Sequence, residues 1–432
     1  MTPIKIKVRD SIALTAIQTD KFKTGVLSVS LRTPLTRKNT AHNAVLSGVM
    51  RRGTVNYPST TVLNKALDEL YASNVELKNS RCGKNCLLTV TAEVLDGAYV
   101  TDGTDVLGGT ARIMSELLLA PLTENGVFVS GSVIKEKMHV CDAIKAEINN
   151  PKAYAADRCA ELLHRNDADF STLEELFEDV DKITPTSLYE YYKELISSSA
   201  LTVYYVGSEA PERVAALIDT HFGAFSGKSA PPSPIASEPC CELVERTEQM
   251  KLTQGKLALG FRVGVTAADK EYFAAVLFNE IFGGSPASKL FMNVREKMSL
   301  CYYCGSRYDT YMGNVTVSAG INVSDKDTAY SAILAQLDDI KNGNISEAEL
   351  TAAKKSIEHS YRQIYDYPID LISFYSNKAI FGIDADPVRY RESFDKVSAK
   401  EIIAVAKKIQ LDSVFFLEGT LDGIEPEEDL DE

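Results

Sequence analysis

The sequence predicts an α+β protein made of two similar lobes, because its first half is repeated in its second half. Residues 23–54 and 253–284 each show an alternating strand, a polar turn, an apolar helix and a glycine stop, and Arg32 matches Arg262 without a gap. The ends of the two halves match as well. A chain of 432 residues is also too long for a single core and fits two lobes. We expect the functional site to lie between the lobes.

The expected elements of the first half follow from the spacing of its apolar residues. Alternating apolar residues predict strands, and apolar residues at helical spacing predict helices. A long helix should end at Asn150, because the residue before Pro151 is pushed out of the α region, and Pro151 should open the next helix. In chain order we expect strands at 11–18 and 24–33, helices at 41–51 and 61–73, strands at 75–78 and 87–94, helices at 106–119, 126–149 and 151–164, two further helices, and a strand at 201–206.

Composition along the chain divides it into four segments. The first lobe is expected over residues 1–225. Residues 226–241 are rich in proline and serine and predict a semi-rigid linker. The second lobe, residues 242–421, should repeat the strand and helix pattern, with a helix at 270–282. Residues 422–432 are acidic and are expected to form a disordered tail.

Bulk properties restrict the class of partner. A formal net charge of −14 argues against nucleic acid or an anionic membrane surface as a partner and is compatible with basic peptides. No stretch approaches the ~18 apolar residues of a membrane span, and the N-terminus has no apolar signal core. We therefore expect a cytoplasmic protein whose eight cysteines are reduced.

Two cysteine pairs have a spacing that is typical of metal sites. Both Cys82/Cys86 and Cys301/Cys304 lie in or beside expected strands. On a continuous strand the first pair would be about 13 Å apart, and the second pair would face opposite sides of the sheet. Neither pair can then bind one zinc ion unless a tight turn intervenes. We expect ordinary cysteines at these positions.

Catalytic motifs are absent from the sequence, but one stretch places two donors together. None of the five histidines forms a His-x-x-Glu-His zinc helix, and no phosphate-binding glycine loop or Gly-x-Ser-x-Gly is present. In residues 283–303, a helix that ends near Lys297 leads into a strand that begins near Leu300. Arg295 and Tyr302 would then lie at the mouth of the lobe, where they could bind a substrate carbonyl.

This stretch resembles the second-lobe signature of the insulinase/pitrilysin metallopeptidases, in the form found in mitochondrial processing peptidase. The signature Ser-x-Leu-Phe-x-x-x-Arg-Glu-Lys-x-x-Leu-x-Tyr is matched at every fixed position between Ser288 and Tyr302. The resemblance implies two homologous lobes, each an antiparallel sheet flanked by helices, arranged as a clamshell around an extended peptide. It also implies that Arg295 and Tyr302 bind substrate and stabilise the tetrahedral intermediate.

The first lobe departs from that family at its zinc motif. The positions of His-x-x-Glu-His are occupied by Ala44-Val-Leu-Ser47-Gly48. The third ligand, a downstream glutamate, falls on Ala143, while Glu136 fits an earlier acidic position of the family. Loss of both histidines and of the glutamate removes the metal and the base that activates water. We expect no metal and no catalytic residue in this chain alone.

The resemblance therefore implies half of an active site. Residues 19–24, 52–59 and 67–71 also resemble zinc-less bacterial homologues, which are usually encoded beside a zinc-bearing sister. The function we expect is that of a non-catalytic, substrate-contacting subunit of a heteromeric zinc metallopeptidase that acts on peptides. A homologous partner chain would supply zinc and the general base, and the chain would pair with itself in the partner's absence. One alternative is a peptide- or protein-binding scaffold without a hydrolytic role, and another is a self-sufficient peptidase that uses other residues.

Overall fold

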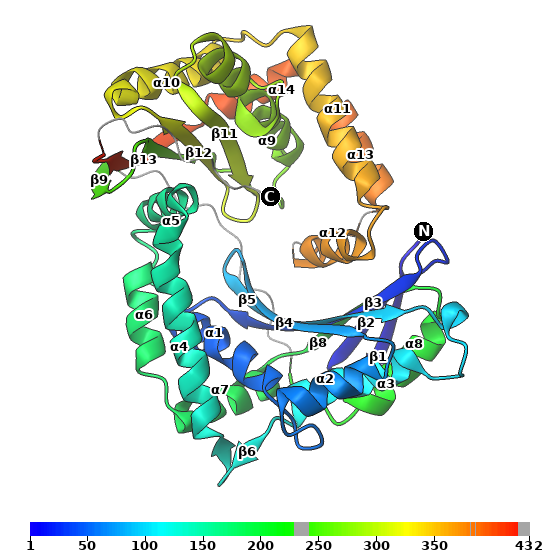
Figure 1. Ribbon diagram of the computed structural model, residues 1–432. Coiled ribbons are helices and arrows are strands. Elements are labelled where there is room, and N and C mark those ends of the chain that lie inside the picture. The colour runs from blue at the N-terminus through cyan, green and yellow to red at the C-terminus, as the bar shows by residue number, and fades with distance from the viewer. Residues whose placement is uncertain (229–241, 381, 385, 422–432) are drawn as a thin grey trace. The chain divides into compact units, whose positions relative to one another are not determined.

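A computed structural model describes residues 1–228, 242–380, 382–384 and 386–421 (Figure 1). These residues form two compact units. The first unit contains Met1–Lys145, residues 168–228 and the described part of Gln363–Asp386. The second contains Ala146–Asp167 and residues 242–362 and 387–421. Most of the predicted linker and the whole acidic tail lie outside the described residues. No helix among the described residues is long and apolar enough to cross a membrane.

The first unit is built on a six-stranded sheet with the strand order β1-β2-β8-β3-β5-β4. Strands β2 and β8 run parallel, and all other neighbours run antiparallel. A separate short pair is formed by β6 (Thr123–Glu124) and β7 (Val127–Phe128). The six strands of the sheet are β1 (Ile4–Arg9), β2 (Ile12–Gln18), β3 (Thr24–Pro34), β4 (Asn74–Cys82), β5 (Asn85–Leu95) and β8 (Leu201–Gly207).

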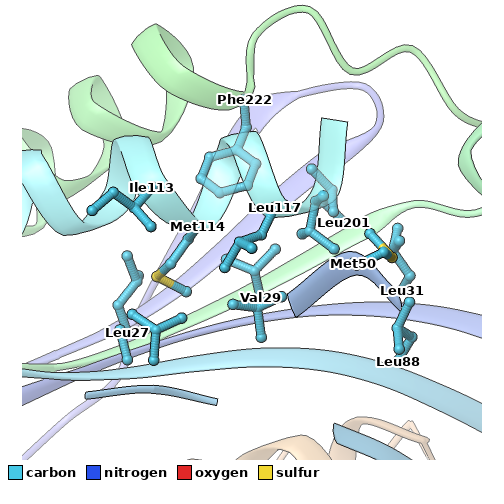
Figure 2. Close-up of a cluster of buried hydrophobic side chains, with 14 of the residues drawn as sticks. Leu27, Val29, Leu31, Met50, Leu88, Ile113, Met114, Leu117, Leu201 and Phe222 are labelled. Carbon is cyan, nitrogen blue, oxygen red and sulfur yellow. The ribbon is translucent and has the colours of Figure 1, made fainter. Parts of the chain in front are cut away.

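Alternation along β3 produces the core of the first unit. Leu27, Val29 and Leu31 are 1% exposed or less, and Figure 2 shows them beside side chains such as Met114 and Leu117. Each such buried side chain contributes roughly 2 kcal/mol. The helices of this unit are α1 (Arg37–Arg51), α2 (Thr60–Asp68), α3 (Val106–Leu119), α4 (Ser130–Ala146), α6 (Leu173–Asp181), α7 (Pro185–Ser198), α8 (Pro211–Phe222) and α12 (Pro368–Ile380), with a short 3-10 turn η1 (Gly97–Tyr99).

The second unit repeats the same topology. Its five-stranded sheet has the order β11-β12-β10-β13-β9, which is the order β4-β5-β3-β8-β2 of the first unit. The one parallel pair, β13 with β9, occupies the place of β8 with β2. The predicted duplication is therefore present, and each sheet is antiparallel apart from this pair. The strands are β9 (Val244–Met250), β10 (Gly255–Arg262), β11 (Cys301–Asp309), β12 (Asn314–Ile321) and β13 (Gln410–Gly419).

The helix expected at 270–282 is present in the second unit but changes its winding. Helix α9 (Tyr272–Asn279) continues into a π-helical turn, η3 (Glu280–Gly284), and a second π-helical segment, η4 (Leu290–Lys297), precedes β11. The other helices of the unit are η2 (Glu147–Asn149), α5 (Pro151–Leu163), η5 (Val323–Asp325), α10 (Lys326–Lys341), α11 (Glu347–Gln363), α13 (Pro387–Asp395) and α14 (Ala399–Ala406).

Two equivalent helices are exchanged between the halves of the sequence. Helices α4 and α11 both contain 17 residues, and α5 and α12, which follow them and begin with Pro151 and Pro368, both contain 13. Yet α5 packs on β10, β12 and β13 of the second unit, whereas α12 packs on β3 and β8 of the first. Each sheet is thus covered in part by a helix from the other half of the chain.

Local differences from the expected elements have simple causes. Helix α1 begins at Arg37 rather than at 41, because the side chain of Thr36 accepts a hydrogen bond from the backbone N–H of Asn39. Helix α2 ends at Asp68, and the backbone is left-handed soon afterwards, with φ of 58° at Tyr71. Strand β1 was not predicted. It is a short edge strand without a fully buried residue, although Ile4, Ile6 and Val8 alternate with charged residues as a strand requires.

Candidate functional site

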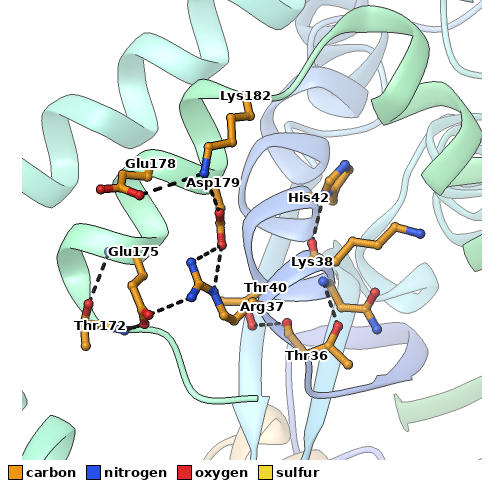
Figure 3. Close-up of polar contacts among 11 residues, drawn as sticks. Thr36, Arg37, Lys38, Thr40, His42, Thr172, Glu175, Glu178, Asp179 and Lys182 are labelled. Atoms are coloured by element: carbon orange, nitrogen blue, oxygen red, sulfur yellow. Dashed lines mark hydrogen bonds and ion pairs between the residues drawn. The ribbon is translucent and has the colours of Figure 1, made fainter. Parts of the chain in front are cut away.

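Helix α1 carries the positions that correspond to the zinc motif. Its first turn is fixed by Arg37, whose guanidinium binds Glu175 at 2.6 Å and Asp179 at 3.0 Å on α6 (Figure 3). Ala44, Ser47 and Gly48 follow on the same helix and are partly buried. The nearby histidine, His42, lies about 200° around the helix from position 44. Its Nδ1 contacts the carbonyl oxygen of Lys38 at 2.8 Å, and burial lowers the pKa of its ring.

A glutamate occupies the space where the second histidine of the motif would stand. A Cβ atom at Gly48 would collide with the carboxylate of Glu136, which comes from α4. That carboxylate binds the Nε of Arg52, and its other oxygen lies 3.5 Å from Nδ1 of His139. The side chain of Glu136 is only 13% exposed. Glycine at position 48 therefore makes room for an internal ion pair.

The remaining motif positions offer no set of metal donors. Ala44, Gly48 and Ala143 have no donor atom, and the hydroxyl of Ser47 donates to the carbonyl of Ala44 at 3.1 Å. Ala143 is exposed on α4 and lies about 10 Å along that helix from Glu136. No group of three or more His, Cys, Asp or Glu that could hold a metal ion occurs in the described part of the chain. These residues do not fit a zinc ion.

In the second unit, the backbone between η4 and β11 brings Arg295 to Tyr302. The last turn of η4 is closed by Met298 N–H donating to Asn293 at 3.0 Å, and the chain reverses at Ser299, which has φ of 52°. Leu300 N–H then donates to Val294 at 3.2 Å. A π-helical turn of this kind is frequent at functional sites.

Tyr302 is exposed to solvent and Arg295 is partly exposed, and both have partners within the chain. The Nε of Arg295 donates to the backbone carbonyl of Tyr302 at 3.0 Å, and its Nη1 lies 3.3 Å from Glu296. The guanidinium also lies over the ring of Phe291, 4.6 Å from the centroid. The Tyr302 side chain is 55% exposed and donates its hydroxyl to Asn322 at 3.1 Å. The two expected donors are therefore brought together in this unit.

A β-bulge at Tyr302 explains its exposure and corrects one expectation. Cys301 pairs with Ile321 and Tyr303 with Gly320, so Tyr302 is the additional residue. As a result, Cys301 and Cys304 are both buried, and the thiol of Cys304 hydrogen-bonds to Cys301, which lowers the pKa of Cys301. The expectation that they face opposite sides of the sheet was wrong, because the bulge shifts the alternation by one residue.

The other cysteine pair also differs from the extended geometry assumed for it. Cys82 ends β4 and Cys86 lies in β5, so a turn at Gly83, with φ of 58°, separates them. Arg81, not Cys82, is the cross-strand partner of Cys86. Both cysteines are buried. The estimate of about 13 Å along one strand therefore does not apply.

Arg295 and Tyr302 line a groove of about 690 Å³ that is formed entirely by the second unit. We call it the Arg295 groove. Its walls are the N-terminal part of α5, with Lys152, and the segment η4. Its floor is the β11–β12 ladder, where Arg307 pairs with Thr316. Further lining residues are Asn150, Ala153, Ala156, Gly283, Phe291, Tyr303, Cys304, Gly305, Ser306 and Ser318.

Several of these residues were missed by sequence reasoning. Arg307 could have been found from the alternation along β11, because it shares a face with Tyr303 and follows it by four residues. No local signal could have found Lys152, since α5 precedes the linker in sequence yet packs on the second sheet. The Arg52–Glu136 pair likewise depends on the packing of two helices that are far apart in the chain.

Comparison with known proteins adds information on family. Residues 182–357 match the family model described as "Peptidase M16 inactive domain". The chain is 31% identical over 404 residues to the Bacillus subtilis (strain 168) protein named "Probable inactive metalloprotease YmfF", with 94% of this chain and 95% of that protein covered. A second protein of that strain, "Uncharacterized zinc protease YmxG", is 22% identical over 245 residues, covering 56% of this chain and 59% of its own length.

Solved structures give the same fold. A conserved protein from Enterococcus faecalis V583 superposes with a TM-score of 0.89 and 26% identity, covering 98% of this chain and all of its own. A structure from Pseudomonas fluorescens, described as a peptidase M16 inactive domain, has a TM-score of 0.79 at 12% identity, with 98% of this chain and 100% of its own covered. At that identity the second likeness shows the fold alone.

Proposed function

Because the chain belongs to the M16 metallopeptidase family, as an inactive homologue, we propose that it is the substrate-contacting, non-catalytic subunit of a heteromeric zinc peptidase. A homologous partner chain would supply the zinc ion and the general base. This chain would supply Arg295 and Tyr302, which bind the peptide backbone. We place this role in the cytoplasm, where buried thiols such as that of Cys159 stay reduced.

The observation that carries the proposal is the contrast between the two units. The zinc-motif positions of the first unit hold Ala44, Ser47 and Gly48, which do not fit a metal. The second unit keeps Arg295 and Tyr302 at an accessible groove. Tyr302 is exposed and Arg295 partly exposed at that groove, so the second unit could contact a substrate although the first unit has no metal to cleave it.

The geometry suggests how the pair would act. The bond from Nε of Arg295 to the carbonyl of Tyr302 fixes the guanidinium at the start of β11. Arg295 lines the groove, where its guanidinium could donate to a peptide carbonyl. The Tyr302 hydroxyl, oriented by Asn322, lies beside it. Donors held in place before the reaction stabilise a developing oxyanion without reorganising, provided that a zinc-bound water is supplied in trans.

The test is activity of the assembled pair. Tagged full-length chain is purified from its native cell, the companion is identified by mass spectrometry, and peptidase rates are measured on the isolated pair. We expect Arg295→Ala to lower kcat/KM by about 10²–10³-fold without changing assembly, the typical loss for one oxyanion donor. Tyr302→Phe, which keeps the ring and the strand, should give a smaller loss. Arg362→Ala, which removes an exposed cation on α11, is the matched control.

An unchanged rate with Arg295→Ala would contradict the proposal. If no zinc-bearing companion is found, the scaffold reading becomes the better one. One observation favours that second candidate, since Arg295 and Tyr302 both bind partners inside the chain and could serve the structure alone. It predicts saturable peptide or protein binding that does not depend on metal. Analytical ultracentrifugation of the chain alone would also test whether it forms a homodimer when the companion is missing.

A further inference from the structure

We propose that the Arg295 groove selects extended peptides that carry carboxylate side chains. The inference rests on the proposed function, because it names the class of peptide that this same groove would take. It runs against the expectation from net charge, which favoured basic peptides. Three features of the groove support the proposal: its cationic side chains, their exposure to a ligand, and the small residues along its floor.

Positive charge gathers in the groove although the chain as a whole is acidic. Lys152 comes from α5, Arg295 from η4 and Arg307 from β11, so three separate elements each contribute one cation. No aspartate or glutamate belongs to the lining among the residues that the structure describes. The formal net charge of the chain is −14, so a cationic groove is a local exception to its surface. Opposite charge in such a site raises both association rate and selectivity.

The cations remain available to a ligand. Lys152 and Arg307 are exposed, and the Nζ of Lys152 lies 4.5 Å from the ring centroid of Tyr303, which orients the ammonium without neutralising it. Two carboxylates lie just outside the lining. Glu296 is 3.3 Å from Arg295, and Asp157 on α5 interacts with Arg307. Asp157 is exposed to solvent, and water screens its interaction with Arg307.

The floor of the groove suits an extended chain. Small residues line both the α5 wall and the floor of the groove. They are Ala153 and Ala156 on α5 and Gly305, Ser306 and Ser318 on the ladder. A volume of about 690 Å³ is within the range of ligand sites. A peptide backbone could lie on these small residues while its side chains reach Lys152 and Arg307. Guanidinium and carboxylate can then pair in bidentate geometry, which gives selectivity for carboxylate over amide side chains.

The experiment compares three fluorescein-labelled peptides of equal length with Glu, Gln or Lys at the same positions. Binding to the full chain is followed by fluorescence anisotropy at low and high salt. We expect the Glu peptide to bind about tenfold more tightly than the Gln peptide at low salt, with the difference shrinking as salt rises. Lys152→Gln combined with Arg307→Gln should abolish that difference.

Two controls separate the effects. Lys355→Gln removes one exposed cation on α11, away from the lining residues, and should leave the preference intact. A variant that ends at Leu421 lacks the acidic residues 422–432, which could otherwise compete with the probe. If the Glu and Gln peptides bind with equal affinity, the inference is overturned. If Arg295→Ala also abolishes that binding, the proposed function still stands. Preference for the Lys peptide would also overturn it. Absence of binding by all three peptides would overturn both.

Discussion

The zinc-motif region of the first unit and the Arg295 groove of the second unit differ in how they treat charge. In the first unit, the carboxylate of Glu136 is 13% exposed, lies against Gly48 and is paired with Arg52. In the second unit, Lys152 and Arg307 are exposed at an open groove. The same topology thus supports a surface that is neutralised internally and one that offers its charges to a ligand. Because the carboxylate of Glu136 occupies the space beside Gly48, restoring two histidines would not by itself restore a metal site.

The largest expected effect concerns the helix that forms one wall of the groove. Arg158 on α5 is 4% exposed and binds Glu161 at 2.7 Å and Glu248 at 3.0 Å. Arg158→Ala would take the buried cation away from Glu161, which is 8% exposed, so we expect the free energy of unfolding to fall by about 3–5 kcal/mol. Urea denaturation measures the loss, and peptide affinity should fall with it.

A matched control uses the same carboxylate. Arg246 also binds Glu248, at 2.8 Å, but its side chain is 48% exposed. Arg246→Ala should cost less than about 1 kcal/mol, as exposed pairs do. Equal losses of stability for the two variants would contradict this expectation. They would show that burial of the Arg158 ion pairs adds nothing to their contribution to stability.

The equivalent helix of the first unit contains a buried cation of a different kind. Burial lowers the pKa of Lys378 on α12 from its ordinary value of 10.5 to about 8. The folded state therefore disfavours the charged form, and this penalty is fully present below pH 8 and disappears as pH rises through 10.5. Lys378→Met should raise the free energy of unfolding by about 1–3 kcal/mol at pH 7.

The pH dependence provides the check on Lys378. The stabilisation, measured by thermal unfolding at several pH values, should shrink between pH 8 and pH 10.5 and be absent above that range. A pH-independent gain would mean that packing against Phe374, whose ring centroid is 5.9 Å from the ammonium, and not charge burial, is responsible.

The smallest effect tests the surface of the first unit. Glycine to alanine inside a helix normally stabilises by about 1 kcal/mol. At Gly48 the added Cβ would displace the carboxylate of Glu136, so we expect Gly48→Ala to lose about 1 kcal/mol instead. Gly131→Ala on α4, where nothing lies within 4 Å of the added Cβ, should not lose stability.

A double-mutant cycle completes that test. In a Glu136→Ala background, Gly48→Ala should regain its normal stabilising sign, because the displaced carboxylate is gone. If the loss persists there, the glycine is needed for another reason.

Zinc content of Ala44→His/Gly48→His, measured by atomic absorption, should stay below one ion per chain.

Sequence reasoning captured the duplication and the pair Arg295/Tyr302 but missed the long-range packing. The offset between halves predicts the repeated sheet, because equivalent strands have equivalent apolar alternation. Periodicity says which face of α5 is buried, but not which sheet buries it, so Lys152 could not be placed. The bulge at Tyr302 was also hidden, since one additional residue in a strand leaves no mark on composition.

The exchange of α5 and α12 has a consequence for the origin and assembly of the chain. Either half alone would lack the helix that covers part of its own sheet, and apolar residues such as Phe415 and Leu417 beneath α5 would be left in water. Two separate halves would have to associate before either was complete, as in a domain-swapped dimer. In a single polypeptide the two halves associate within one molecule. Completion of the two units therefore does not depend on protein concentration.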